Sequence, residues 1–317
     1  MRAVRMERFG GPEVLEPVEV PDPVIGADEV LIEVEAAEVL FLDTQLRAGW
    51  GQEYFKLELP VVLGAGVAGV VDSVGSGVDT GLVGQRVIAG TGGVGTYAGG
   101  GYAERAAVPA TEVFPVPDGL ELTTALAALH DGATALSQLD LASVSAGERV
   151  LITAAAGSLG SWLIPLLSAT GVTVIAAARG SAKLARAREL GAHETVDYSV
   201  PGWSEGIDGV DVVFDGAGGE IGRAAYAITR PGGRFLGYGA ASGDFAGADH
   251  RDDITVVGIH RPDAVAWRDL PRRALQLFAD KTLTPAIGQT FPLGEAAAAH
   301  AAIEARTAVG KTLLLPA

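Results

Sequence analysis

The residue types best suited to chemistry in this chain lie in one glycine-rich turn. Ala154, Gly157 and Gly160 follow one another at three-residue spacing, directly after the apolar run Arg149–Ala154 and at the start of an expected helix over Leu159–Ala169. In such a strand–turn–helix unit, small residues let a pyrophosphate approach the backbone, and the first N–H groups of the helix face its charge. The pattern therefore predicts a dinucleotide site, the alternative being a tight turn without a ligand. The expected phosphate-facing set is Ala154, Gly157, Ser158, Leu159 and Gly160.

The next strand indicates which dinucleotide would bind. An NAD site usually places an acid about 20 residues after the first glycine, where it holds the ribose 2′-hydroxyl. No acid directly follows the expected strand Val172–Ala177, and Arg179, Ser181 and Lys183 stand there instead. Two cations and a hydroxyl suit a 2′-phosphate, so the sequence favours NADP(H). The alternative is that Arg179 and Lys183 are solvated charges at a helix start, although cations there oppose the helix dipole.

Metal and thiol chemistry are not expected. The chain has no cysteine, and its five histidines form no i, i+4 pair. These absences argue against a zinc or iron–sulfur site. Without a strong Lewis acid, the expected reaction is hydride addition to an activated acceptor, either a quinone or an α,β-unsaturated carbonyl.

Candidates for proton transfer are few. His130 precedes Thr134 by four residues, so it is a candidate proton donor, with a hydrogen-bonded structural histidine as the alternative. The Thr134 hydroxyl is a candidate for stabilising charge on the acceptor oxygen. Tyr54, Tyr97 and Tyr102 fall in expected loops, and each is either a donor or a buried, satisfied side chain.

Two hydrophobic patterns predict the strands and helices that position these residues. Short alternating strands in the first ~120 residues indicate a barrel-like β domain; they are Glu29–Ala36, Gly69–Gly75, Arg86–Ala89 and Tyr102–Val108. After a helical stretch over Leu122–Leu139, buried strands alternate with helices, which predicts a doubly wound parallel sheet. These strands are Arg149–Ala154, Val172–Ala177, Glu194–Val196, Val210–Phe214, Gly233–Tyr238 and Ile254–Ile259, with a second helix at Ala182–Leu190. Helices at Leu270–Ala279 and Gly294–Glu304 precede a last strand, Gly310–Leu315, expected to rejoin the first domain.

Composition excludes several classes of partner. The 317 residues carry a formal charge of −16 and are 48% hydrophobic. A protein that binds nucleic acid or an anionic membrane needs a basic surface, and the sequence contains no run of five or more basic residues. No apolar stretch approaches the ~18 residues of a membrane span. The N-terminus lacks the apolar core of a signal peptide, so we expect a cytoplasmic protein with a small-molecule substrate.

Further motifs make the comparison with a known family specific. They include Asp43-Thr44, Ala68-Gly69-Val-Val71, Gly84-Gln-Arg-Val87, Gly101-Tyr-Ala-Glu104, Gly132-Ala-Thr134, Val196-Asp-Tyr198, Val210-Asp-Val-Val-Phe-Asp215, Pro231-Gly-Gly-Arg234 and Gly310-Lys311. Over nearly its whole length the chain resembles the zinc-independent medium-chain dehydrogenases/reductases of the quinone oxidoreductase, or zeta-crystallin-like, group.

The resemblance implies an α/β fold with two domains. A Rossmann sheet over residues 122–263 would bind NADP(H), and both chain ends, 1–121 and 264–317, would form a GroES-like β-rich domain, with the substrate in the cleft. It also implies Lys183 and Tyr198 at the 2′-phosphate, and a homodimer through Ile254–Ile259. Residues implied to lie by the nicotinamide are Thr134, Gly237, Tyr238, Gly239 and Ser242.

The residues that differ from those usual in the family lie at positions that line the substrate site in the family. Leu40 stands where the family usually has Asn, and Gln45 where Tyr is frequent. The family's Pro-Gly-Ser-acid stretch is Leu63-Gly-Ala-Gly66 here. We therefore expect a larger and more apolar acceptor pocket, lined by Leu40 and Gln45. Two functions stay open: an NADPH-dependent quinone or enone reductase, and an NADPH-binding sensor or structural protein with little turnover.

Overall fold

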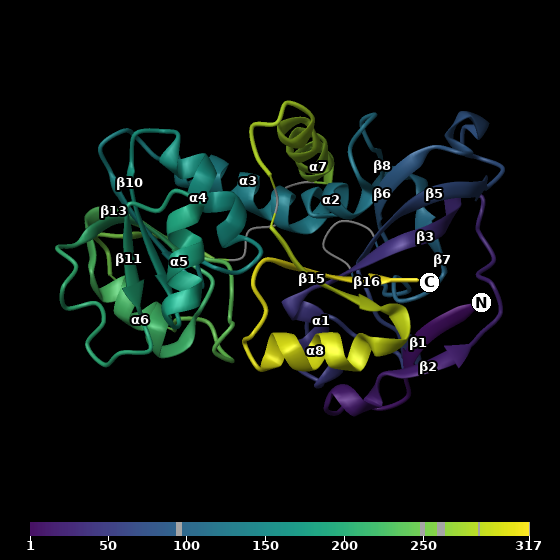
Figure 1. Ribbon diagram of the computed structural model, residues 1–317, viewed down its shortest axis with the longest axis horizontal. Helices are drawn as coiled ribbons and strands as arrows, with labels where there is room; N and C mark the ends of the chain where they lie inside the picture. Colours follow the sequence, from purple (N-terminus) through teal and green to yellow (C-terminus); the bar gives the residue numbers. More distant parts are fainter. Residues whose placement is uncertain (93–96, 248–250, 259–263, 285, 317) are drawn as a thin grey trace. The chain divides into compact units, whose positions relative to one another are not determined.

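The computed structural model describes residues 1–92, 97–247, 251–258, 264–284 and 286–316. The chain divides into two compact units, one made of Met1–Ala133 with Asp263–Ala317 and the other of Thr134–Pro262 (Figure 1). Each unit is described by itself below.

The first unit is built on a seven-stranded sheet. Its strands run in the order β15-β16-β3-β5-β6-β8, and β7 also pairs with β3. Their bounds are β3 (Glu29–Val39), β5 (Gly66–Val74), β6 (Arg86–Gly90), β7 (Arg105–Pro109), β8 (Val113–Pro115), β15 (Ile287–Pro292) and β16 (Lys311–Leu315). A smaller sheet has the order β2-β1-β4, with β1 (Arg2–Met6), β2 (Glu16–Glu19) and β4 (Val61–Val62). The β-rich character predicted for this domain is confirmed.

Both chain ends contribute to this unit. The last strand, β16, pairs antiparallel with β3 through Thr312 with Val39 and Leu314 with Ala37. The sequence predicts only that this strand rejoins the first domain. In Figure 1 the yellow strands β15 and β16 accordingly lie beside β3. Strand β3 is longer than predicted, because it continues to Val39 where Ala37, Glu38 and Val39 pair with β16.

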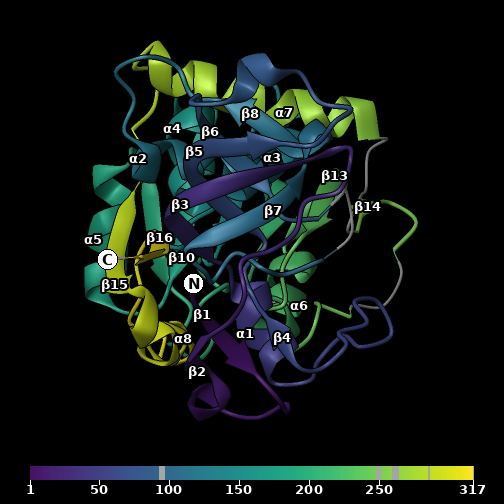
Figure 2. The same cartoon turned by 90° about the vertical axis from the view of Figure 1, so that its right-hand side faces the viewer.

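The first unit also contains helices, most of them short. They are η1 (Pro12–Val14), α1 (Phe41–Arg47), η2 (Thr80–Leu82), η3 (Ala110–Glu112), α2 (Leu122–Leu126), η4 (Ala128–Gly132), α7 (Ala264–Ala279), η5 (Leu293–Glu295) and α8 (Ala296–Glu304). Helix α8 packs on α1, β15 and β16. Helix α7 lies next to β8 (Figure 2), where Arg272 stacks over the Phe114 ring at 5.2 Å and Arg268 pairs with Glu112.

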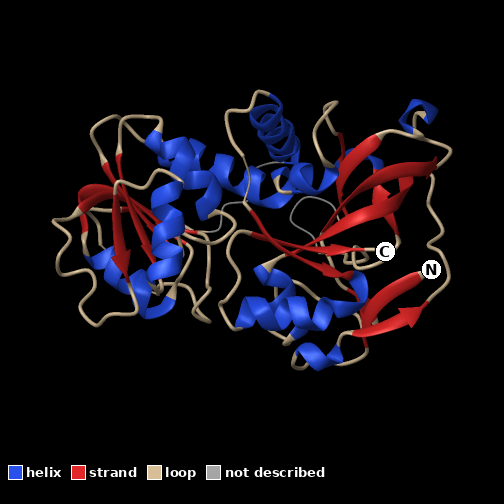
Figure 3. Cartoon of the chain, viewed as in Figure 1, coloured by secondary structure: helices blue, strands red, loops and turns tan. Residues whose placement is uncertain are grey.

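The second unit is a six-stranded parallel sheet with helices, as the strand–helix alternation predicts (Figure 3). Its order is β11-β10-β9-β12-β13-β14, with β9 (Arg149–Thr153), β10 (Thr173–Ala178), β11 (Glu194–Asp197), β12 (Val210–Asp215), β13 (Thr229–Gly237) and β14 (Thr255–Val257). The helices are α3 (Ala133–Ala142), α4 (Gly160–Ser168), α5 (Ser181–Glu189) and α6 (Gly219–Ala227). Helices α4 and α5 pack on β9, β10 and β11, and α6 packs on β9, β12 and β13. Strands β9, β10 and β12 have buried apolar side chains on both faces, as central parallel strands require.

The boundary between the units differs from the one expected. The sequence assigned residues 122–263 to the nucleotide-binding domain, but α2 and η4 group with the first unit, because α2 packs on β3, β5 and β6. The continuous helix expected over Leu122–Leu139 is also interrupted. The Gly132 N–H bonds to the carbonyl of Ala127, five residues back, which makes η4 a π-helical turn between α2 and α3.

Candidate active site

The turn between β9 and α4 has the close approaches that small residues allow. A Cβ on Gly160 would lie 2.0 Å from the carbonyl oxygen of Ala155, so a side chain there would force α4 away from the strand. Ala154 adopts a left-handed conformation with φ of 51°, and the Ala155 N–H bonds back to Ala177 of β10. Among the residues that the structure describes, no side chain caps the N-terminus of α4, and its first turn carries no acid, so its amides are suited to an anionic ligand.

A buried threonine–aspartate pair fixes the ends of β9 and β12. The Thr153 hydroxyl donates to Asp215 over 2.5 Å and accepts the N–H groups of Gly216 and Ala217 at 3.1 Å. Asp215 also accepts the Gly218 N–H at 3.1 Å, and burial raises the pKa of this carboxyl. The pair was not predicted, although an acid at the end of the apolar run Val210–Phe214 could have indicated it.

The loop after β13 packs on the loop after β12 through backbone groups. The N–H groups of Tyr238 and Gly239 donate to the Asp215 carbonyl at 3.0 and 3.1 Å, and Ser242 N–H donates to Ala217 at 2.8 Å. A Cβ on Gly239 would lie 2.5 Å from the Gly216 carbonyl oxygen. The segment Gly237–Ser242, named from the sequence, is thus held at the carboxyl ends of β12 and β13.

The residues named for the 2′-phosphate gather at the ends of β10 and β11. The Arg179 guanidinium lies 6.0 Å from the centre of the Tyr198 ring, while Ser181 and Lys183 belong to the first turn of α5. Asp197 was not predicted; its carboxylate accepts the Gly180 N–H at 3.0 Å. Hydrogen bonds from Ser199 lower the pKa of Asp197, so it stays ionised beside Arg179. The uncapped α4 and α5 N-termini and this cation set fit a phosphorylated dinucleotide.

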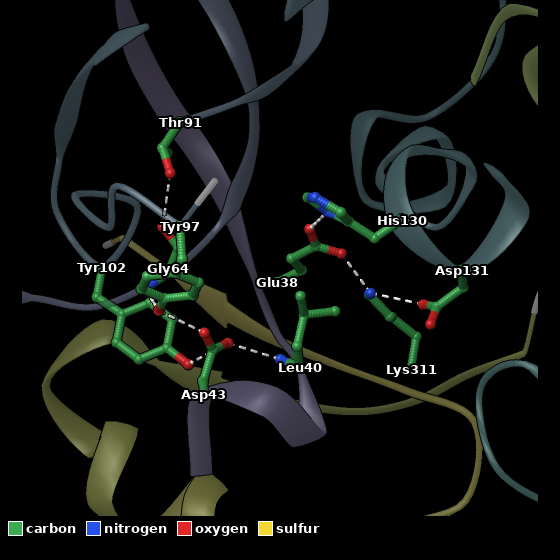
Figure 4. A network of polar contacts seen from close by, with 10 residues as sticks. All are labelled: Glu38, Leu40, Asp43, Gly64, Thr91, Tyr97, Tyr102, His130, Asp131 and Lys311. Atoms are coloured by element: carbon green, nitrogen blue, oxygen red, sulfur yellow. Dashed lines mark hydrogen bonds and ion pairs between the residues drawn. The ribbon is translucent and has the colours of Figure 1, made fainter. Parts of the chain in front are cut away.

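The first unit contains two clusters of ionisable side chains (Figure 4). In one, Asp43 accepts hydrogen bonds from Tyr97 at 2.5 Å, Tyr102 at 3.0 Å and the N–H of Leu40 at 2.7 Å. Burial raises the pKa of Asp43 to about 6. His300 contacts the Tyr102 hydroxyl at 2.9 Å, and burial followed by the charge of Arg47 lowers the pKa of His300 to about 3.

The three candidate tyrosines have different surroundings. Burial, followed by the charge of Asp43, raises the pKa values of Tyr97 and Tyr102 well above their ordinary value. The Tyr97 hydroxyl also accepts the Gly64 N–H at 2.8 Å. Both tyrosine hydroxyls therefore make hydrogen bonds inside the core. Tyr54 is 67% exposed. This arrangement favours the structural alternative for Tyr97 and Tyr102.

The second cluster comprises Glu38, His130, Asp131 and Lys311. The Lys311 ammonium donates to Asp131 over 2.6 Å and to Glu38, whose other oxygen accepts the Nδ1–H of His130. Burial would raise the pKa of Glu38, but His130 and Lys311 outweigh it and hold this pKa at about 2. His130 was predicted from the sequence and Glu38 was not, although an acid between Ala37 and Val39 in an apolar run was a usable signal.

The remaining named residues are partly buried. Leu40 precedes α1, and its N–H bonds to Asp43 while its side chain offers no polar group. Gln45 lies in α1. Thr134 lies in the first turn of α3, where the second unit begins.

Comparisons with known proteins agree with this architecture. A 2-haloacrylate reductase from a Burkholderia species is 35% identical over 337 aligned positions, covering 99% of this chain and 98% of that protein. A quinone oxidoreductase from Pseudomonas aeruginosa is 31% identical over 335 positions, covering 99% of both. The chain belongs to the quinone oxidoreductase group of the medium-chain dehydrogenases/reductases.

Domain families and solved structures support this membership. Residues 26–118 match the alcohol dehydrogenase GroES-like domain, and residues 190–314 match a family described as zinc-binding dehydrogenase. A mycobacterial protein solved in complex with NADPH is 31% identical, with a TM-score of 0.87 and complete coverage of both chains. The resemblance drawn from the sequence motifs is therefore confirmed, and the protein is an oxidoreductase of this group.

Proposed function

We propose that this protein transfers hydride from NADPH to a quinone or an α,β-unsaturated carbonyl compound. The main evidence is the set of groups at the carboxyl ends of β9, β10 and β11. They are the uncapped N-terminus of α4, the close-packed Gly160, and Arg179 near Tyr198. The names of the relatives support the same chemistry, since they include quinone oxidoreductases and a 2-haloacrylate reductase. A structural neighbour in complex with NADPH supports the choice of cofactor.

The nucleotide would be held mainly by the second unit. The N–H groups of the β9–α4 turn would bind the pyrophosphate, and Arg179, Ser181, Lys183 and Tyr198 the 2′-phosphate. When bound, NADPH supplies a hydride from its nicotinamide ring. Thr134 and the segment Gly237–Ser242 would orient that ring, and the Thr134 hydroxyl or backbone N–H groups would stabilise negative charge on the acceptor oxygen.

The acceptor would meet an apolar surface on the first unit. Leu40 stands where the family usually has an asparagine, and Gln45 where a tyrosine is frequent. We therefore expect a roomy pocket that favours bulky enones or polycyclic quinones. His130 is the candidate proton donor on this unit. These departures also favour a second function, binding of NADPH without useful turnover, as in a sensor.

One experiment separates the two functions. NADPH oxidation is followed with a panel of benzoquinones, polycyclic quinones and enones, alongside NADPH binding by fluorescence. Turnover of any acceptor class supports the reductase, whereas tight binding without turnover supports the sensor. Absence of NADPH binding contradicts both.

We infer that the reaction needs no metal. The chain lacks cysteine, and within the described residues no three His, Asp or Glu side chains lie close enough together to hold a metal ion. The matched family is nevertheless described as zinc-binding, so the point needs a direct test. Chelator treatment should leave turnover and melting temperature unchanged; stoichiometric zinc in the purified protein would contradict the inference.

We also infer a homodimer formed through the edge of the second unit. Strand β14 is the last strand of the sheet, and Val256 on it is 52% exposed. Pairing with a second copy would cover this edge. Ile259, at the end of the segment named from the sequence, lies outside the described residues. A monomer by light scattering would contradict the dimer. We place the protein in the cytoplasm on its cysteine-free composition, and within the described part no helix is long and apolar enough to cross a bilayer.

A further inference from the structure

Four ionisable groups from three distant segments meet inside the first unit (Figure 4). Glu38 comes from β3, His130 and Asp131 from the π-helical turn η4, and Lys311 from β16. Glu38 and Lys311 are almost fully buried, whereas 31% of the His130 side chain is exposed. Two carboxylates against one ammonium leave one negative charge, which a protonated His130 neutralises.

Glycine at position 66 makes room for this cluster. A Cβ there would lie 2.2 Å from the Glu38 carboxylate and 2.5 Å from the Leu129 side chain. Strands β3 and β5 pair antiparallel through Ala37 and Val67, which places Glu38 and Gly66 next to each other. The carboxylate that orients His130 therefore depends on the absence of a side chain from the neighbouring strand.

His130 is the member of the cluster with an unused polar atom. Its Nδ1–H donates to Glu38, and within the described residues its Nε2 makes no hydrogen bond. Lys311, in contrast, is enclosed between Glu38 and Asp131. The π-helical turn that carries His130 is a type of irregularity often found at functional sites, and it ends at Gly132, two residues before Thr134.

The charges around His130 favour its protonated form. Burial would lower the pKa of His130, but the charge and the hydrogen bond of Glu38, together with the charge of Asp131, outweigh burial and the opposing charge of Lys311 and raise this pKa. Helix α7, which also packs on η4, directs Arg268 to Glu112 and Arg272 to the Phe114 ring. An imidazolium with its Nδ1–H fixed has one remaining proton to give, on Nε2.

We propose that His130 is the acid that protonates the α-carbon of an α,β-unsaturated carbonyl or carboxylate substrate after hydride addition, with Glu38 and Lys311 as its positioning residues. This inference rests on the proposed function. Hydride addition at the β-carbon moves the C=C electron pair to an enolate. The Nε2–H bond then breaks, the proton forms the new C–H bond at the α-carbon, and neutral His130 takes a proton from water. A quinone depends less on this acid, because its reduced oxygens exchange protons directly with water.

The closing experiment compares His130→Gln with His193→Gln, an exposed histidine of the other unit. For an enone, His130→Gln should lower kcat about 100-fold, and the enone-to-benzoquinone ratio of kcat at least about tenfold. The wild-type enone rate should fall as pH rises through the His130 pKa, and this fall should be absent in His130→Gln. Added imidazole should restore part of the lost rate. His193→Gln should behave as wild type.

A readout without cofactor tests the positioning residues. In NMR titrations of the apo protein, the His130 midpoint should move to lower pH in Glu38→Gln, and also in Gly66→Ala, where the methyl group displaces the carboxylate. The His193 resonance serves as the internal reference. These titrations keep the test decisive even where His130→Gln does not fold.

The outcomes separate this inference from the proposed function. Equal losses of enone and quinone turnover in His130→Gln, an unchanged pH profile, or an unmoved His130 midpoint in Glu38→Gln overturns the acid assignment alone. A wild-type protein that turns over neither acceptor overturns the proposed function, and the assignment with it.

Discussion

In the unit Thr134–Pro262 most of the groups expected to contact a ligand belong to the backbone, whereas the other unit buries charged side chains beside its candidate proton donor, His130. The β9–α4 turn offers amides and a glycine packed against Ala155, and the β12 and β13 loops are joined by N–H to carbonyl bonds. The first unit instead buries Glu38, Lys311 and Asp43. Backbone groups keep their polarity at any pH, while buried charges depend on partners and protonation. Nucleotide binding should therefore be insensitive to charge substitutions that strongly affect the first unit.

The largest expected effect comes from breaking the buried ion pairs of the first unit. Lys311→Met leaves Glu38 and Asp131 with His130 as their remaining cation, and should lower the free energy of unfolding by about 3–5 kcal/mol. Lys56→Met, at an exposed lysine of the same unit, is the control. Denaturant unfolding measures both. Loss of less than about 1 kcal/mol would show that the cluster is not a stabilising unit.

The same cluster predicts an acid dependence. Because the folded-state pKa of Glu38 is lowered from 4.5 to about 2, its contribution to stability is present above pH 4.5 and is lost as pH falls toward 2. The stability difference between wild type and Glu38→Gln should therefore shrink across this window. A difference independent of pH would mean that the Glu38 carboxylate is not ionised in the folded protein.

A smaller effect is expected at the backbone-built site. Gly160→Ala should destabilise the protein by about 2 kcal/mol and weaken NADPH binding, because its methyl group would meet the Ala155 carbonyl. Gly206→Ala is the matched control, since a Cβ there has no neighbour within 4 Å. Unfolding and NADPH titration measure the two effects. Equal behaviour of the two variants would contradict close packing at Gly160.

Charged side chains of the second unit should matter for selectivity. Wild type should bind NADPH at least tenfold more tightly than NADH, about 1.4 kcal/mol, and Arg179→Ala with Lys183→Ala should remove that preference. Arg186→Ala with Arg188→Ala, at the other end of α5, removes equal charge and should leave the ratio intact. Equal affinities in wild type would contradict the assignment of the 2′-phosphate site.

The smallest effect concerns the acceptor pocket. Leu40→Asn with Gln45→Tyr should shift the kcat/KM ratio toward small benzoquinones by about 1 kcal/mol, because a ring to stack on and an amide are restored. Steady-state kinetics with a small and a polycyclic quinone measure the ratio. Faster turnover of small benzoquinones than of any bulky acceptor by wild type would contradict the apolar pocket.

The two units also differ in how much the sequence reveals. The second unit was predictable in its strands and in the glycine turn between β9 and α4, because parallel strands appear as apolar runs and glycine spacing is local. The Glu38–Lys311 contact joins residues 273 positions apart, and no local pattern encodes it. The π-helical turn was missed because its composition is that of an ordinary helix, and the boundary near residue 133 was missed because α2 packs on distant strands. Asp197 became identifiable only once its backbone partner was known.

The position of β16 after the second unit in the chain has a consequence for biosynthesis. Residues 134–262 leave the ribosome as one continuous stretch, so their sheet can form while later segments are still being translated. The sheet of the first unit, by contrast, cannot be completed until its last strand has been synthesised. Until Lys311 emerges, the carboxylate of Glu38 has no ammonium partner. The nascent first half therefore carries an incomplete sheet, in which the end of β3, from Ala37 to Val39, lacks its partner strand β16. Chaperone dependence during synthesis should concentrate on this half of the protein.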